Sequence, residues 1–511
     1  MKNKNITMMT DFYEFTMGCA YYKAGLKDEV AVFDAFYRKN PFKTGYGVMG
    51  GVDKIVDFIK NFHFTDEDIE YLRNTKQFPD DYLEYLRDLK FTGSIYAVSD
   101  GTPVFPNEPL VTVKAPIIEA QLIETILLSY LNANICYTTA ARRVVEAAGN
   151  IGIMEFGARR ALGVEAAVDA SKCAVIGGCV GTSNTLAGQI YNIPALGTMA
   201  HSLVTEADNE YEAFLNYAKA YPNNCVLLVD TYDTLKSGVP NAIKVAYDYL
   251  IPNGYRLKGI RIDSGDLAYL SKTAKKMLVE AGLDDVKICL SNGLKEDTIK
   301  SLLDQGAVID SIGLGDNIVL PDNARVGCVY KNVAVLKNGE YISRIKVSDD
   351  ILKAITPGYK RLYRFYDNDS GYALGDLIAL HDEQIGRETF TLIDPTNEEN
   401  TTTLSNYKLR ELQEPVVLDG NIVKEDKTIL EKRAYCNREM QTLYPEIKRL
   451  CNPHEYYVDL TLKLLEQKKA LIREAKSHSV SLVGYGFNNN SNEKINGKDK
   501  GFTRSLEIIK N

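Results

Sequence analysis

The sequence predicts an α/β fold, in which an irregular (β/α) barrel is joined to an α+β domain built from the N-terminal region and part of the C-terminal region. Short apolar runs recur through residues 151–317, and each ends in small, charged or hydroxyl residues. Strands that are apolar along their whole length are buried on both faces, as in parallel sheets. Helical patterns at 242–250 and 270–281 separate several of the runs, and repeated strand–helix units indicate a parallel sheet or barrel.

The runs expected to supply barrel strands are IGIMEFGARRA, CAVIGGCVGTSN, IPALGTMAHS, CVLLVDTYDT, GIRIDSGDL, KICLSNGL and DSIGLGDN. Their polar tails fall at the carboxyl ends of the strands, where α/β barrels carry their chemistry. We therefore expect the reactive side chains to form a ring around one mouth of the barrel.

The length of 511 residues exceeds the size at which a single hydrophobic core stops growing, so two or three domains are expected. Residues 1–132 are predicted to form an N-terminal α+β domain, with a helical stretch at 62–89 and a small sheet at 93–116. Residues 133–345 are assigned to the barrel. Residues 346–511 are assigned to a partly β C-terminal region that packs on the N-terminal domain or extends it.

Composition excludes several classes of protein. The net charge of −8 argues against broad nucleic-acid binding, which needs a basic face. No apolar run approaches the roughly 20 residues that span a bilayer, so no membrane association is expected. The N-terminus has no long apolar core followed by a small-residue cleavage site, which argues against a secretory signal. The nine cysteines form no CxxC pair, and this pattern indicates reduced thiols and a cytoplasmic location.

His201 is the first candidate for a catalytic residue. The chain has five histidines, and only His201 directly follows an expected barrel strand with small neighbours. An imidazole at a strand end can act as an acid or base, or as a nucleophile that forms a covalent intermediate. The alternative is a structural or surface histidine.

Acidic residues end two consecutive expected strands. Asp230 and Asp263 are placed to hold sugar hydroxyls or Mg²⁺, both of which suit oxygen ligands, and Arg261 lies between them in the sequence. Asp233 and Asp266 are interpreted as N-caps of the helices that follow.

Glycine-rich, aromatic and basic residues complete the expected ring. Turns at Gly293, Gly313 and Gly315 can present backbone N–H groups to phosphate oxygens. Phe156 offers a ring that can stack on a planar heterocycle, and Arg159 offers a guanidinium group suited to a carboxylate or phosphate. The neighbouring Arg160 is the weaker candidate because it can serve as a solvated helix residue.

The ordered series EFGARRA, GTSN, GTMAHS, LVDTYDT, GIRIDSGDL, SNGL, GLGD and GCVYK, together with TDFYEFTM near the start, resembles the nicotinate phosphoribosyltransferase family from about Thr10 to about Arg364. The resemblance implies an enzyme that joins nicotinate to phosphoribosyl pyrophosphate and releases nicotinate mononucleotide and pyrophosphate for NAD synthesis. It also implies ATP as a co-substrate, a requirement for Mg²⁺, and a homodimer with active sites at the interface.

The resemblance also assigns roles to residues. It implies that His201 becomes a phosphohistidine and that Asp230 and Asp263, with Arg261, lie at the ribose and Mg²⁺. The residues implied to contact nicotinate are Tyr13 from the partner subunit, Phe156, Arg159, Ser183, Thr198 and Arg261. The residues implied to bind the phosphate and diphosphate are Gly293, Gly313, Gly315, Arg38, Lys331, Lys346 and Lys360.

Two positions bear on the specificity of the implied reaction. Related nicotinamide-specific enzymes carry an aspartate where this chain has Ser183, and a hydroxyl can donate to the carboxylate of nicotinate whereas a buried aspartate would repel it. The family often has a threonine where this chain has Asp316, an anion beside the expected phosphate. Transfer to nicotinamide or quinolinate, and a non-catalytic barrel that binds NAD precursors, remain the alternatives.

Overall fold

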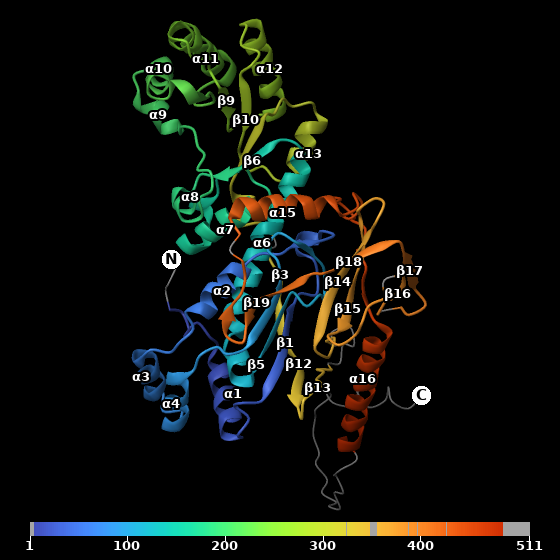
Figure 1. Ribbon diagram of the computed structural model, residues 1–511. Helices are drawn as coiled ribbons and strands as arrows, with labels where there is room; N and C mark the ends of the chain where they lie inside the picture. The colour runs from blue at the N-terminus through green and yellow to red at the C-terminus, as the bar shows by residue number, and fades with distance from the viewer. Residues whose placement is uncertain are drawn as a thin grey trace, which may run out of the picture.

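The structure is a computed structural model that describes residues 5–483, except 323, 348–354, 387, 396 and 426, and gives only the backbone for 478–483. The barrel strands lie in one lobe, and two other large sheets lie in the second lobe (Figure 1). The predicted fold class, an irregular (β/α) barrel with an α+β domain, is confirmed. Helix α15 (Ile429–Gln441) packs on helix α7 (Val164–Ile176) of the barrel and so links the C-terminal region to it.

A seven-stranded sheet with the order β13-β12-β1-β5-β3-β19-β20 forms the centre of the N-terminal domain, and its pairings are antiparallel. Its strands are β1 (Val30–Phe36), β3 (Ser94–Val98), β5 (Val111–Pro116), β12 (Val329–Lys337), β13 (Glu340–Ser343), β19 (Gln413–Leu418) and β20 (Asn421–Ile422). Around it lie α1 (Phe12–Lys23), α2 (Val52–Lys60), α3 (Asp66–Asn74), α4 (Asp80–Asp88), α5 (Ile117–Leu122) and the short pair β2 (Gly47–Val48) and β4 (Pro103–Val104).

Segments from three parts of the chain therefore share this sheet. The range 133–345, assigned from the sequence to the barrel, includes β12 and β13, which extend the N-terminal sheet through β1 instead. The sequence of a strand does not show which sheet the strand joins, because its pairing partners lie far away in the chain. The expected helical stretch at 62–89 is two helices, α3 and α4, and the expected sheet at 93–116 is present.

The barrel is an open sheet of six parallel strands in the order β7-β6-β11-β10-β9-β8. They are β6 (Gly152–Glu155), β7 (Gly181–Thr182), β8 (Val226–Leu228), β9 (Gly259–Ile262), β10 (Lys287–Leu290) and β11 (Ser311–Leu314). The accompanying helices, besides α7, are α6 (Glu124–Ala148), α8 (Thr185–Tyr191), α9 (His201–Glu206), α10 (Glu210–Ala220), α11 (Val239–Val245), α12 (Leu267–Glu280), α13 (Glu296–Asp304) and α14 (Asp316–Val319).

Two of the expected barrel strands differ from the structure. The CAVIGG part of the second run belongs mainly to the end of α7, and only Gly181–Thr182 is a strand there. Helix α7 is buried at every position from Ala167 to Ile176. A short apolar run inside a buried helix cannot be told from a buried strand by periodicity. The IPALGT run is a loop, joined to the sheet by an isolated bridge between Thr182 and Ala195.

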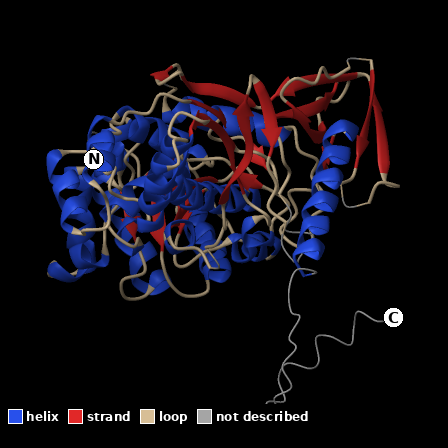
Figure 2. Cartoon of the chain, turned by 90° about the horizontal axis from the view of Figure 1, so that it is seen from below, coloured by secondary structure: helices blue, strands red, loops and turns tan. Residues whose placement is uncertain are grey.

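A third sheet occupies the C-terminal region, with the order β17-β16-β21-β15-β14-β18. Its strands are β14 (Lys360–Asp367), β15 (Ala373–Leu380), β16 (Thr389–Ile393), β17 (Thr401–Ser405), β18 (Tyr407–Glu411) and β21 (Val458–Leu460), and α16 (Leu462–Val483) follows β21. Figures 1 and 2 both place this sheet and α16 at one edge of the molecule.

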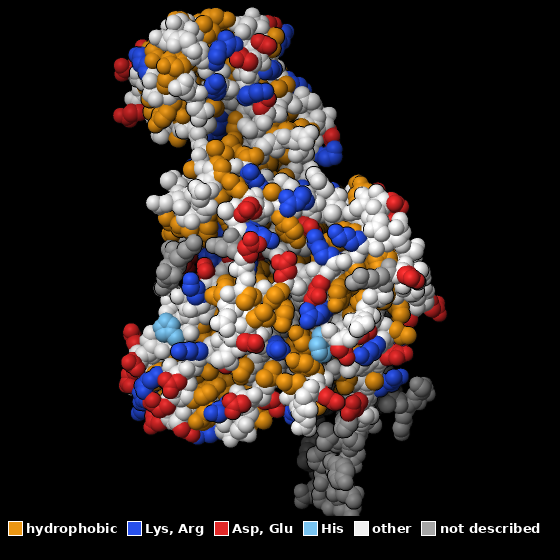
Figure 3. Space-filling view, viewed as in Figure 1, with side chains coloured by type: hydrophobic (Ala, Val, Ile, Leu, Met, Phe, Trp, Pro, Cys, Tyr) orange, Lys and Arg blue, Asp and Glu red, His pale blue; other side chains and the backbone are white. Residues whose placement is uncertain are grey.

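The surface of the molecule is mixed in charge. On the face shown in Figure 3, Lys and Arg side chains are interspersed with Asp and Glu. Within the described part of the chain, no helix has both the length and the apolar content needed to cross a membrane. All nine cysteines are free thiols.

Candidate active site

A cavity of about 410 Å³ opens at the carboxyl ends of several barrel strands. Its lining residues are Phe156, Ala158, Arg159, Ser183, Gly197, Thr198, Met199, Ala200, His201, Leu228, Arg261 and Asp263. Because β6, β7, β8 and β9 are parallel, their carboxyl ends bring together residues more than a hundred positions apart in the chain. The predicted ring of side chains around one mouth of the barrel is therefore present.

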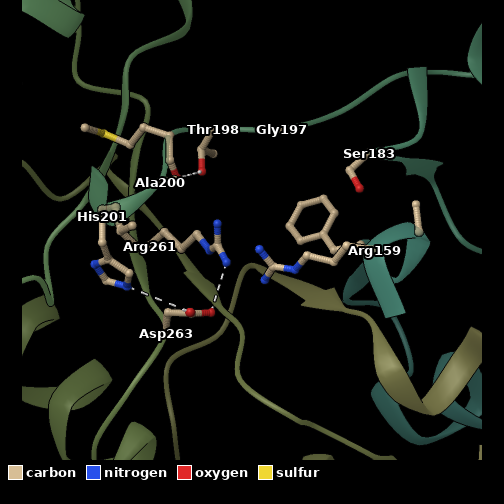
Figure 4. A pocket seen from close by; sticks show the side chains of 12 residues that line it. Arg159, Ser183, Gly197, Thr198, Ala200, His201, Arg261 and Asp263 are labelled. Atoms are coloured by element: carbon tan, nitrogen blue, oxygen red, sulfur yellow. Dashed lines mark hydrogen bonds and ion pairs between the residues drawn. The ribbon is translucent and has the colours of Figure 1, made fainter. Parts of the chain in front are cut away.

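The cavity contains a flat apolar surface next to positive charge. The guanidinium carbon of Arg261 lies 5.6 Å from the centroid of the Phe156 ring. In Figure 4 the guanidinium groups of Arg159 and Arg261 point toward one another. Two like charges that face each other favour an anion between them. This part of the cavity suits a planar ring that carries a carboxylate.

Gly313 makes room for the Phe156 ring. A Cβ atom on Gly313 would lie 2.4 Å from Cε2 of Phe156, which is far inside van der Waals contact. Gly157 is equally crowded, because its Cβ would lie 2.7 Å from the carbonyl oxygen of Gly315. The loops after β6 and β11 therefore touch, and this contact accounts for small residues in both loops. Neither Gly313 nor Gly315 lines the cavity.

Arg261 and Asp263 form the centre of a hydrogen-bonded group. Arg261 donates from Nη2 to Oδ1 of Asp263 over 2.9 Å and from Nε to the hydroxyl of Ser291 over 2.8 Å. The Ser291 hydroxyl in turn donates to Oδ1 of Asp263. These contacts fix the direction of both charged groups, because each side chain is held from two sides. Ser291 follows β10 directly, so its position at a strand end indicates the mouth of the barrel, but its hydrogen-bond partners come from another strand.

Asp230 contacts the backbone of Asp263 outside the cavity lining, and one of its carboxylate oxygens accepts no hydrogen bond from the described residues. Its Oδ2 accepts from the backbone N–H of Asp263 over 3.0 Å and from the hydroxyl of Ser264 over 2.5 Å. Its Oδ1 is buried and has no hydrogen-bond partner among the described residues. As predicted, Asp233 and Asp266 cap helical turns: Asp233 accepts from the N–H groups of Leu235 and Lys236, and Asp266 from that of Tyr269.

His201 is the first residue of α9 and faces Asp263 across the cavity. Its Nε2 lies 4.0 Å from Oδ2 of Asp263, and its Nδ1 lies 3.1 Å from the hydroxyl oxygen of Thr231. The side chain is 43% exposed, so it is open to the cavity. Thr231 follows Asp230 at the end of β8, and sequence reasoning did not single it out.

Asp316, the anion that departs from the family pattern beside the expected phosphate, pairs with a cation outside the cavity. It opens α14, and its Oδ1 lies 3.4 Å from Nε of Arg160, with both side chains more than half exposed. Gly293 has a φ of 55° in the turn after β10 and lies outside the cavity lining.

Three of the other predicted cations, Arg38, Lys331 and Lys346, lie outside the barrel cavity. Burial lowers the pKa of Lys331, Glu124 opposes this shift, and the charges of Lys346 and Arg38 lower the pKa further, which places these three cations near one another. Arg38 lines a second cavity of about 1050 Å³. The basic residues in that lining are Arg38, Lys39, Lys43, Arg143, Lys295 and Arg325.

The ammonium group of Lys360 is buried and already bound by neighbouring oxygen atoms. The residue is 3% exposed, and its Nζ lies 2.7 Å from Oδ2 of Asp34 and donates to the carbonyl oxygens of Thr356 and Gly358. Its ammonium group is therefore engaged by a buried carboxylate and two carbonyl groups, and the diphosphate role of Lys360 stays a prediction.

Tyr13 lies on α1, outside the cavity, and is 47% exposed. Burial of its hydroxyl and the nearby carboxylates of Glu124 and Glu14 raise the pKa of Tyr13 to about 12. Its ring is therefore available to another molecule rather than to the cavity of its own chain.

Comparison with known proteins identifies a family whose members resemble this chain over nearly its whole length. Three family models match in chain order: the nicotinate phosphoribosyltransferase N-terminal domain at residues 8–132, the nicotinate phosphoribosyltransferase family at 151–355, and the nicotinate phosphoribosyltransferase C-terminal domain at 359–468. A nicotinate phosphoribosyltransferase of Bacillus subtilis (strain 168) is 41% identical over 480 residues, which cover 93% of this chain and 97% of the relative.

More distant relatives extend over similar lengths. A nicotinate phosphoribosyltransferase of Caenorhabditis elegans is 34% identical and covers 90% of this chain and 92% of its own. Among solved structures, human nicotinic acid phosphoribosyltransferase superposes with a TM-score of 0.80 at 28% identity and covers 90% of this chain and 99% of its own. The chain belongs to the nicotinate phosphoribosyltransferase family.

Proposed function

We propose that this chain is a nicotinate phosphoribosyltransferase that forms nicotinate mononucleotide and pyrophosphate from nicotinate and phosphoribosyl pyrophosphate. The observation that carries the proposal is the barrel cavity of a member of this family, where Phe156, Arg159 and Arg261 surround a space suited to a planar carboxylate. His201 and Asp263 line the same space, so groups for binding and for chemistry share one cavity.

The transfer needs positioning and charge neutralisation more than covalent help from the protein. The pyridine nitrogen attacks C1 of the ribose, the bond from C1 to the pyrophosphate oxygen breaks, and positive charge develops on the sugar ring. A base held against Phe156 by Arg159 and Arg261 would be oriented for that attack. The carboxylate of Asp263 lines the same cavity and would stabilise the positive charge on the sugar.

The carboxylates fit a magnesium ion that is shared with the substrate. Mg²⁺ is usually held by one or two carboxylates together with substrate phosphates and water. The buried and unpartnered Oδ1 of Asp230 suits such a ligand, while Asp263 already holds Arg261 and Ser291. No group of three or more His, Cys, Asp or Glu side chains able to hold a metal occurs within the described residues, so the substrate must complete the shell. When bound, the ion neutralises the diphosphate leaving group.

We further propose that ATP hydrolysis is coupled to the transfer through His201. A nitrogen of His201 would attack the γ-phosphorus of ATP. The bond from that phosphorus to the bridging oxygen would break, and ADP would leave with the oxygen. Water would later cleave the phosphohistidine and release phosphate. The exposed imidazole beside Asp263 is sterically open to a phosphoryl donor. A phosphoryl group there adds negative charge next to the arginines, so it changes the affinity for anionic substrates.

The remaining predicted contacts fit a homodimer. Tyr13 is exposed on α1, and Arg38, Lys331 and Lys346 form a basic cluster outside the barrel cavity. In the proposed dimer these side chains complete the active site of the partner, with Tyr13 against the pyridine ring and the cations against the diphosphate.

The test is a reaction assay with purified protein. Nicotinate, nicotinamide and quinolinate are each incubated with phosphoribosyl pyrophosphate, Mg²⁺ and ATP, and the mononucleotide, pyrophosphate and ADP are quantified. Product from nicotinate alone, with ADP formed in proportion, is expected. Product from nicotinamide or quinolinate would assign another substrate, and binding without any product would indicate a non-catalytic barrel.

A histidine variant tests the ATP coupling separately. His201→Ala is expected to abolish ADP formation and acid-labile labelling from γ-labelled ATP. His454→Ala, at an exposed position in the C-terminal region, is the matched control and should retain both. ATP turnover that persists in His201→Ala would remove the phosphohistidine from the mechanism.

A further inference from the structure

Glu155 is a fully buried carboxylate directly beneath the base-binding cavity. It is the last residue of β6, it is 0% exposed, and it does not line the cavity. One carboxylate oxygen, Oε1, accepts from the backbone N–H of Gly157. The other, Oε2, accepts from the hydroxyl of Ser171 over 2.9 Å and from the hydroxyl of Thr182.

These contacts join the two loops that carry the predicted nicotinate residues. Gly157 lies between Phe156 and Arg159 in the loop after β6, and Thr182 directly precedes Ser183 in the loop after β7. The backbone reinforces the connection, because the N–H of Ser183 donates to the carbonyl oxygen of Glu155 over 2.8 Å.

Helix α7 anchors the group from below. The Ser171 hydroxyl also contacts the carbonyl oxygen of Ala167 over 2.8 Å, and Asn184 donates from Nδ2 to Ser171 over 3.3 Å. The backbone N–H of Asn184 donates to the Thr182 hydroxyl over 3.0 Å. Both loops are therefore fixed to one rigid helix through a single carboxylate.

We propose that Glu155 is a positioning residue, which holds the Phe156–Arg159 loop and the Ser183 loop at the separation that a nicotinate ring requires. The inference rests on the proposed function for its substrate. Glu155 itself touches neither the cavity nor the reacting atoms, and both of its oxygens are occupied, so it acts through the loops. Its contribution is to arrange the base site before the substrate binds, which lowers the KM for nicotinate.

Glutamine and methionine at this position separate hydrogen bonding from charge. In Glu155→Gln the amide oxygen can accept from Gly157 N–H, while the NH₂ group can donate to the Ser171 and Thr182 hydroxyls. Ser171 then donates to the carbonyl oxygen of Ala167, a contact already within reach. Methionine has a similar shape but leaves the Gly157 N–H and both hydroxyls without this acceptor.

The expected result is a split between KM and kcat. With saturating phosphoribosyl pyrophosphate and ATP, Glu155→Met should raise the KM for nicotinate by about tenfold or more, because buried donors lose their acceptor, and should change kcat much less. Glu155→Gln should stay within about threefold of the wild-type KM, because the contacts to Gly157 and Ser171 are kept and only the hydroxyl proton of Thr182 loses its acceptor. Equal losses in both variants would indicate that the charge matters and would overturn the proposal.

Glu119 provides the matched control. It is 4% exposed on α5, and it accepts from the backbone N–H of Thr92 over 2.6 Å and from the Thr92 hydroxyl over 2.9 Å, so it is the same kind of buried acceptor outside the cavity lining. Glu119→Met should lower thermal stability without raising the KM for nicotinate. A KM change in Glu119→Met that matched that of Glu155→Met would reduce the effect to general destabilisation.

Hydrogen–deuterium exchange tests the positioning role of Glu155 without any substrate. Peptides that contain residues 156–160 and 181–184 should exchange faster in Glu155→Met than in the wild type, and at the wild-type rate in Glu155→Gln. If the wild type failed to use nicotinate and this exchange pattern still appeared, the proposed function would fail and the positioning role would stand. If Glu155→Met does not fold, Thr182→Val removes one partner and should move both readouts in the same direction, and unchanged readouts would contradict the proposal.

Discussion

The Nδ1 atom of His201 lies 3.1 Å from the hydroxyl oxygen of Thr231. Because Nδ1 is engaged on the side of β8, the Nε2 atom is left facing Asp263 and the cavity. A hydrogen bond to one ring nitrogen determines which nitrogen is free to react. Thr231 therefore orients the imidazole that we propose is phosphorylated.

Thr231→Val keeps the shape of the side chain but removes this hydrogen bond. We expect ADP formation per mononucleotide to fall by about tenfold, the effect of losing about 1.4 kcal/mol of orientation, while the KM for nicotinate changes little. Thr205→Val, on the same helix, loses only a contact to the carbonyl oxygen of Ser202 and should behave as the wild type. Undiminished coupling in Thr231→Val would show that His201 does not depend on this contact.

Ser183 is exposed and lines the cavity, and the preference for the acid that its hydroxyl predicts can be tested there. Ser183→Asp places a carboxylate where the carboxylate of nicotinate is expected, and the two like charges repel. We expect the KM for nicotinate to rise about tenfold or more, and nicotinamide to become the better substrate of the two. Ser202→Asp adds the same charge at an exposed position outside the cavity lining and serves as the control. A Ser183→Asp enzyme that still prefers nicotinate would place the base elsewhere.

Gly313→Ala tests the close approach of β11 to the Phe156 ring. The added methyl group would lie 2.4 Å from Cε2 of Phe156, so the ring must move. We expect a loss of about 1–3 kcal/mol in the free energy of unfolding, typical of overpacking, together with a raised KM for nicotinate. Gly152→Ala, in the adjacent strand, meets nothing closer than 3.5 Å and should leave both quantities near the wild type. Urea denaturation and steady-state kinetics measure the two effects.

The sequence was sufficient to predict which strand ends meet at the cavity. His201 lines the cavity at the start of α9, although the run before it is a loop and not the expected barrel strand. Phe156, Arg261 and Asp263 each lie at or directly beyond an apolar strand, and parallel strands bring their carboxyl ends together whatever the length of the connections. That inference needs only local patterns and one rule of topology.

The sequence alone could not predict the contacts that depend on tertiary packing. Ser291, Thr231 and Glu155 stand in the quoted segments, but their partners come from other strands and from α7, so local sequence gives no sign of the hydrogen bonds. The basic stretch around Lys360 and the family resemblance predict a substrate ligand, but in the structure Lys360 pairs with Asp34, a residue more than three hundred positions away. Tertiary contacts decided each of these cases.

Lys360→Met should reduce stability rather than impair diphosphate binding. The Asp34 carboxylate is 2% exposed and would be left as a buried charge without its cation. We expect a loss of about 3–5 kcal/mol in the free energy of unfolding, measured by urea denaturation. Asp34→Asn combined with Lys360→Met removes both charges and should recover much of the loss. A stable Lys360→Met enzyme with a raised KM for phosphoribosyl pyrophosphate would restore the diphosphate role.

Glu14, next to Tyr13 on α1, should make stability depend on pH. Burial raises the pKa of Glu14 to about 7, Thr125 and Thr10 oppose the shift through hydrogen bonds, and the charges of Glu124 and Asp11 add to it. Its ordinary pKa is 4.5, so between about pH 4.5 and 7 the folded state binds more protons than the unfolded state. Stability from this group is therefore full below pH 4.5 and declines as the pH rises toward 7.

Glu14→Gln removes this titration and keeps the shape of the side chain. The free energy of unfolding of the variant relative to the wild type should increase from pH 5 to pH 8 by up to about 3 kcal/mol, because folding raises the pKa of Glu14 from 4.5 to about 7. Urea denaturation at a series of pH values measures the difference, in which the titration of all other groups largely cancels. A difference that stays constant with pH, or that decreases as the pH rises, would show that the Glu14 carboxyl is ionised in the folded protein throughout this range.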